Sequence, residues 1–122
     1  MNINVTDADD GVTHVALGGR FDIAGAQQVD SLFSALANSS KGLIVDLANV
    51  SFLASLGVRT LMLSAKTLIR RGAEMAVCGA DENVEKVLRS TGFDEIVNLY
   101  RDFESAKAGL MSKPAPFASK KA

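Results

Sequence analysis

The chain has 122 residues, and 13 lysines and arginines against 14 acidic residues give it a formal net charge of -1. This length fits one domain, and a hydrophobic content of 48% excludes a chain that is disordered throughout. The near-zero charge argues against nucleic acid as a direct partner, because binding to phosphate backbones depends on clustered lysine and arginine.

The first part of the chain shows two alternating runs, one helical pattern and one apolar run. Residues 2–5 and 12–17 alternate in short runs that predict a strand hairpin. Apolar residues at helical spacing predict a helix over 23–37, with Asp22 at its start. The run 43–47 is apolar and rich in β-branched residues, which predicts a strand buried on both faces at the centre of a sheet.

The middle of the chain alternates between helical and strand patterns. Residues 49–53 are interpreted as a brief connection, and apolar spacing over 56–71 predicts an amphipathic helix. Gly72 is a plausible stop for this helix, and 73–78 then predicts another strand.

Beyond the middle, one more helix, strand and helix are expected. Asp81 is placed to cap a third helix that ends at Gly92, and 95–100 predicts the last strand. A final helix is expected over 102–111. Alternating helices and strands imply right-handed crossovers, so we expect an α/β fold whose mixed, mainly parallel sheet has about five strands and about four helices.

Residues that commonly carry catalysis are few and scattered. His14 is the only histidine and lies in a strand pattern, and Cys78 ends a predicted core strand, where free cysteine behaves as a small apolar residue. The acids Asp46, Glu82 and Glu85 form no recognisable metal motif. No phosphate-binding glycine loop is present. These observations disfavour a classical enzyme, and no metal or other cofactor is expected.

Ser55 is the most informative position, because it follows the predicted central strand at the start of the second helix. A serine there accepts a hydrogen bond from an unpaired helix N–H, which is the commoner use of serine at an N-cap. The same end of the helix dipole stabilises an added phosphate. Capping and phosphorylation therefore both remain open for Ser55 on physical grounds.

The order of several segments resembles the STAS domain of bacterial anti-sigma factor antagonists, over roughly residues 3 to 110. The segments that carry the resemblance are LGGRFD (17–22), IVDL (44–47), VSFLASLG (50–57) and GAEMAVC (72–78), followed by VEKVL (84–88) and STGF (90–93). The resemblance implies the STAS fold, with a single STAS domain over 1–111. The proline-, alanine- and lysine-containing stretch 112–122 is expected to be a disordered tail.

The resemblance also implies a function. In this family, the serine that opens the second helix is phosphorylated by an anti-sigma factor that is itself a serine kinase of the GHKL ATPase type, and a PP2C-type phosphatase removes the phosphate. Ser55 holds this position. The implied protein is a cytoplasmic partner-switching regulator that binds the kinase and releases its client. A single cysteine and the absence of a long apolar run agree with a cytoplasmic chain that does not associate with membranes.

The sequence departs from the family pattern next to the serine. Where the family has Asp-Ser-Ser/Thr-Gly, this chain has Ala54-Ser55-Leu56-Gly57, so a carboxylate and a hydroxyl are missing. Asp22 matches an acidic residue of the family and is interpreted either as a cap for the first helix or as a contact for the partner. Arg59 is expected on the same partner-binding surface as Asp22 and 54–57.

Two other functions follow from the same observations. A constitutive STAS interaction or scaffold module would use Ser55 only as a cap, and the altered residues Ala54 and Leu56 would mark escape from kinase control. A small-molecule-binding domain is the third alternative, although no cofactor-shaped motif supports it.

Overall fold

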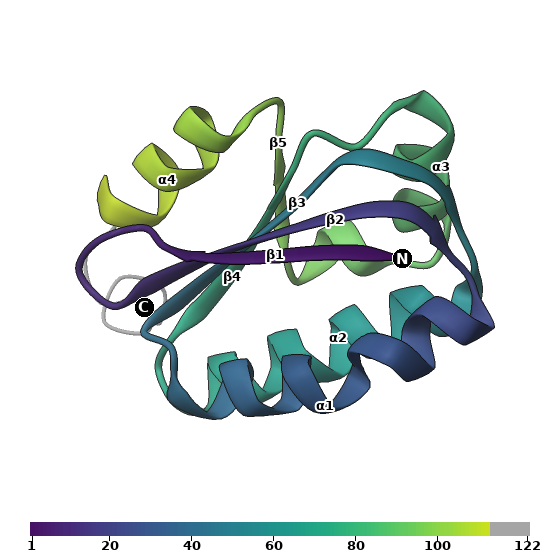
Figure 1. Cartoon of the computed structure of the whole chain (residues 1–122). Coiled ribbons are helices and arrows are strands. Elements are labelled where there is room, and N and C mark those ends of the chain that lie inside the picture. The colour runs from purple at the N-terminus through teal and green to yellow at the C-terminus, as the bar shows by residue number, and fades with distance from the viewer. Residues whose placement is uncertain (113–122) are drawn as a thin grey trace.

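A computed structural model describes residues 1–112, and its centre is one five-stranded mixed sheet (Figure 1). The strands follow their sequence order across the sheet; β1 is antiparallel to β2, and the other neighbours are parallel. The strands are β1 (Asn2–Asp7), β2 (Val12–Phe21), β3 (Gly42–Leu53), β4 (Glu74–Cys78) and β5 (Asn98–Tyr100). The predicted α/β class and mainly parallel sheet are confirmed, with β3 at the centre.

Helices cover both faces of this sheet. Figure 1 shows α1 and α2 side by side along one face and α4 on the opposite face. The helices are α1 (Ile23–Ser39), α2 (Ser55–Arg70), α3 (Glu82–Ser90) and α4 (Phe103–Ser112), with a short 3-10 helix, η1 (Phe93–Glu95), after α3. The order of helices and strands is the one that the sequence predicts.

The central strand β3 is buried on both faces, as its apolar run predicts. Leu43, Val45 and Leu47 point into the larger core, which includes the buried faces of α1 and α2. Ile44 points the other way, into a smaller core under α4 that also holds Cys78. Side chains alternate between the faces because successive residues of a strand point to opposite sides.

The structure corrects the prediction for residues 49–53, which continue β3 instead of forming a connection. They pair with the second half of β2, and the pairs include Asn49 with Gly18 and Leu53 with Phe21. The register between these strands shifts twice along this stretch. Such irregularities break the two-residue alternation by which a strand is recognised from sequence.

The last predicted strand is also shorter than expected. Gly92 adopts a left-handed backbone conformation with a φ of 80°, and η1 follows it directly. Phe93 and Val97 lie four residues apart and are both buried in the larger core. That spacing suits a helical turn, so only Asn98–Tyr100 forms a strand.

The C-terminal helix α4 ends at Ser112, one residue later than expected. Of the stretch 112–122 that is predicted to be disordered, Ser112 belongs to α4, and 113–122 lie outside the described residues. Within 1–112, none of the helices combines the length and the apolar character needed to cross a membrane.

Candidate functional site at the start of α2

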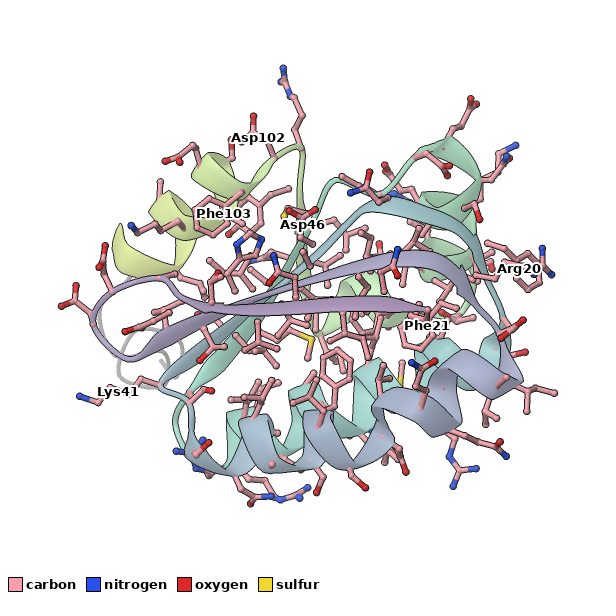
Figure 2. The ribbon with its side chains drawn as sticks, viewed as in Figure 1. Arg20, Phe21, Lys41, Asp46, Asp102 and Phe103 are labelled. Atoms are coloured by element: carbon pink, nitrogen blue, oxygen red, sulfur yellow. The ribbon has the colours of Figure 1, made fainter. Side chains whose placement is uncertain are left out.

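The ends of β2 and β3 bring the starts of α1 and α2 together. Phe21, the last residue of β2, is in register with Leu53, the last residue of β3. The backbone N–H of Ala54 donates to the carbonyl oxygen of Phe21 at 2.9 Å. Figure 2 shows Arg20 and Phe21 at this end of the molecule. In an open α/β sheet, the carboxyl ends of parallel strands are where binding sites form.

Ser55 is the first residue of α2, and the residue at the N-cap is Ala54. The extended backbone of Ala54, with φ -90° and ψ 163°, places its carbonyl oxygen where it accepts from Gly57 and Val58 at 2.9 and 3.2 Å. Of the two uses left open for Ser55, capping is therefore wrong, because the helix begins one residue earlier than a capping Ser55 requires. The Ser55 side chain is exposed, and its hydroxyl has no hydrogen-bond partner within 1–112.

Gly57 lies beneath this helix start and presents no surface to a partner. It is buried, and a Cβ atom at this position would lie 2.9 Å from the Cδ1 atoms of both Leu53 and Phe21. Only a residue without a side chain lets the first turn of α2 approach the ends of both strands this closely. Gly57 therefore holds Ser55 in place without contacting a partner itself.

Asp22 is the N-cap of α1, which confirms one of the two interpretations given for it. Its Oδ1 accepts from the backbone N–H of Gly25 at 3.0 Å, and its Oδ2 lies 3.6 Å from Nε of Arg20. The Gly25 N–H is the main cause of a lowered pKa for Asp22; partial desolvation opposes this effect, and Arg20 adds to it. The carboxylate is half-buried, so a contact with a partner remains compatible with its role as a cap.

Arg20 and Phe52 form an exposed pair that the sequence analysis missed. The guanidinium carbon of Arg20 lies 4.3 Å from the centre of the Phe52 ring, and Phe52 is 40% exposed. A cation over an aromatic face is a favourable contact, and arginine and aromatic residues are enriched in interface hot spots. The pair arises from the shifted register of β2 and β3, for which the sequence carries no local signal.

A groove lies between α1 and α2, and Leu56, the residue after Ser55, forms part of its lining. Its lining residues are Ala26, Gln27 and Asp30 of α1 and Leu56, Arg59, Thr60 and Leu63 of α2. Leu63 is 52% exposed, and Ile23, at the start of α1, is 60% exposed. Arg59 is exposed and makes no hydrogen bond or ion pair within the described part of the chain. The site thus combines apolar side chains with an unpaired cation.

The other residues singled out from the sequence lie elsewhere. His14 contacts Asp46, with Nε2 to Oδ2 at 3.1 Å, and its ring centre lies 4.2 Å from that of Phe103. Figure 2 shows Asp46 and Phe103 on the face of the sheet opposite α1 and α2. Cys78 is buried, and desolvation, with smaller effects of nearby carboxylates, raises its pKa to about 12. A thiol of this kind is inert at neutral pH.

Glu82 and Glu85 lie in the first turn of α3, and neither lines the groove between α1 and α2. Within residues 1–112, no three or more His, Cys, Asp and Glu side chains are grouped to hold a metal ion.

The fold and this site define an α/β domain with a serine exposed at the start of its second helix. The chain belongs to the STAS domain family, whose model matches residues 4–106.

Named proteins that are similar to this chain include anti-sigma factor antagonists. The chain is 27% identical over 105 residues to the protein BtrV of Bordetella bronchiseptica. The aligned region covers 85% of this chain and 90% of BtrV. It is 22% identical over 101 residues to the anti-sigma-B factor antagonist of Staphylococcus aureus, covering 81% and 94% of the two chains. The crystal structure of an anti-sigma factor antagonist from Mycobacterium paratuberculosis superposes with a TM-score of 0.82 at 26% identity, covering 91% of this chain and 94% of the other.

Proposed function

We propose that this chain is a partner-switching regulator whose association with an anti-sigma-factor serine kinase is controlled by phosphorylation of Ser55. The unphosphorylated chain binds a kinase of the GHKL ATPase type and displaces the kinase's client. The observation that carries the proposal is the Ser55 hydroxyl, which is exposed at the start of α2 and makes no hydrogen bond within 1–112. A kinase reaches such a hydroxyl without unfolding the helix.

The switch acts through charge at the interface. Phosphorylation adds a charge of about -1.5 to -2 to Ser55 at neutral pH. Burying that charge against a partner surface arranged for a neutral hydroxyl carries a large desolvation cost. The kinase is then released to bind its client, and a PP2C-type phosphatase restores the hydroxyl. The chain itself supplies no catalytic group in this cycle, which we place in the cytoplasm.

The proposed partner surface surrounds Ser55. Leu56 is half-buried and lines the groove between α1 and α2, where it offers apolar contact. Arg59 offers a positive charge to an acidic group of the partner, and Asp22 offers the edge of its carboxylate. Ala54 contributes a small, uncharged side chain directly before the serine. Gly57 contributes from beneath, by setting the position of the helix start.

The proposal is tested by comparing binding of the wild type, Ser55→Ala and Ser55→Asp to the GHKL-type anti-sigma kinases of the source bacterium by titration calorimetry. We expect Ser55→Ala to bind as the wild type does and Ser55→Asp to bind at least tenfold more weakly, about 1.4 kcal/mol. Ser39→Ala and Ser39→Asp are matched controls, because Ser39 is exposed at the far end of α1. Equal binding by all variants contradicts control by charge at Ser55.

Phosphorylation itself is tested on the chain purified from its native host under phosphatase inhibition. Intact-mass and peptide mass spectrometry should locate one phosphate on Ser55.

A constitutive STAS interaction module is the second candidate, and the residues that flank Ser55 favour it. Ala54 and Leu56 stand where the family has a carboxylate and a hydroxyl, which removes two polar groups next to the serine. This candidate predicts a stable complex with a partner and no phosphate on Ser55 in any growth condition. The same mass spectrometry therefore separates the two functions.

A further inference from the structure

Two arginines lie at the end of the sheet where α2 begins, Arg20 in β2 and Arg59 in α2, and they differ in what they already contact. Arg20 is engaged, because its Nε lies 3.6 Å from Asp22 and its guanidinium covers the Phe52 ring. Arg59 has neither an acidic partner nor a hydrogen bond within 1–112, although Asp30 lines the same groove. Arg59 is therefore the cation that is free to meet a new negative charge.

The geometry of α2 directs Arg59 toward Ser55. The two residues are four positions apart in one helix, and both are exposed. Residues at this spacing are neighbours on a helix surface, and side chains lean toward the N-terminal end of the helix. A long side chain at Arg59 thus extends over the turn that contains Ser55. An acid placed four residues before a base is the more favourable order of such a pair.

We infer that Arg59 is the internal partner of phosphorylated Ser55, and that its guanidinium folds back along α2 to bind the phosphate. This inference rests on the proposed phosphorylation of Ser55. Arginine presents a planar fork of donors that matches two phosphate oxygens. Phosphorylation then changes the partner surface in two ways. It adds a dianion at Ser55, and it draws the Arg59 guanidinium away from the groove between α1 and α2. No rearrangement of the backbone is needed.

The experiment introduces phosphoserine at position 55 during translation, so that no kinase is required. The second pKa of the phosphate, ordinarily about 6, is then measured by phosphorus-31 NMR in the wild type, Arg59→Gln and Arg59→Lys. Arg20→Gln is the matched control, because it removes the same charge at the same end of the molecule. Circular dichroism confirms that each variant is folded.

We expect the phosphate pKa to lie about 0.3 units lower in the wild type than in Arg59→Gln, because a cation nearby favours the dianion. Arg59→Lys should retain part of this difference, and Arg20→Gln should leave the pKa unchanged. The Arg59 Nε–H resonance should also shift between the unmodified and phosphorylated chains. An equal pKa in the wild type and Arg59→Gln, or an equal effect of Arg20→Gln, overturns the inference.

The two proposals fail in different ways. Native chain without phosphate on Ser55 contradicts the switch but leaves the measured pairing of Arg59 intact. If the native chain carries phosphate on Ser55 but the phosphate pKa is the same in the wild type and Arg59→Gln, the switch is supported and Arg59 has no part in it.

Discussion

The start of α2 differs from the starts of α1 and α3, although all three helices follow an extended residue. Asp22 accepts from the Gly25 N–H at 3.0 Å, and Asp81 accepts from the Val84 N–H at 2.8 Å. At α2 the same position is Ala54, whose side chain makes no capping bond. In α1 and α3 one N–H of the first turn is thus bonded to a side-chain cap, whereas α2 lacks such a bond and depends on packing. The proposed switch lies at the uncapped helix start.

At α2, packing against the core provides the stabilisation that side-chain caps provide at α1 and α3. Seven of its sixteen residues are buried, against two of nine in α3. Burial of apolar side chains is worth about 1.5–3 kcal/mol for each large one, which exceeds the contribution of a single cap. A helix held in this way tolerates a change of charge at its exposed first residue.

The largest effect is expected from Gly57→Ala, which attacks the packing on which α2 depends. The new methyl group would lie 2.9 Å from the side-chain Cδ1 atoms of Leu53 and Phe21 and 3.0 Å from the Phe21 carbonyl oxygen, so these side chains or the helix must shift. We expect a loss of about 1–3 kcal/mol in the free energy of unfolding, measured by urea denaturation. Ser55→Ala, an exposed change in the same turn, should alter it little. Equal stability of Gly57→Ala and the wild type would show that this contact is not tight.

Removal of a cap should cost less. Asp81→Ala leaves the Val84 N–H without its acceptor, and we expect a loss of about 1 kcal/mol in the same denaturation experiment. Asp81→Asn should stay close to the wild type, because asparagine also caps helices well. If alanine and asparagine behave alike at this position, the cap contributes nothing measurable to α3.

Addition of a cap to α2 should have a smaller effect of opposite sign. Ala54→Asp places an acceptor at the one position of the three where the chain has none, and we expect a gain of about 0.5–1 kcal/mol. The change also restores the carboxylate that the family pattern has before the serine. Ala54→Asn separates capping from charge. A loss of stability in both variants would mean that the strand ends leave no room for a side chain here.

The smallest effect concerns pH. Because the pKa of Asp22 is lowered from 3.8 in the folded chain, its contribution to stability is present above that value and is lost as the pH falls through the folded pKa. Asp22→Asn retains a capping acceptor but cannot titrate. We therefore expect the wild type to lose more stability than Asp22→Asn between pH 5 and pH 2 in thermal unfolding. Parallel curves for the two chains would contradict a titrating cap at α1.

Local patterns in the sequence were sufficient for the element order and for two of the helix starts. The spacing of apolar residues and the positions of Asp22 and Asp81 predict α1 and α3 because the interactions concerned span only a few residues. The apolar run of β3 likewise predicts a strand buried on both faces, since that property belongs to its own side chains. The resemblance to the STAS domain pointed to Ser55 as the central residue of the site.

Tertiary structure decided the details of that site. The extension of β3 to Leu53 and the pairing of Arg20 with Phe52 depend on a shifted register between β2 and β3, which no local pattern encodes. The same pairing sets where α2 begins, and so it makes Ala54 the cap and leaves the Ser55 hydroxyl unbonded. The sequence alone thus determined the order of helices and strands, because those preferences are local, whereas the ends of β3 and β5 depended on tertiary contacts. The surface around Ser55 was decided by contacts between residues far apart in the chain.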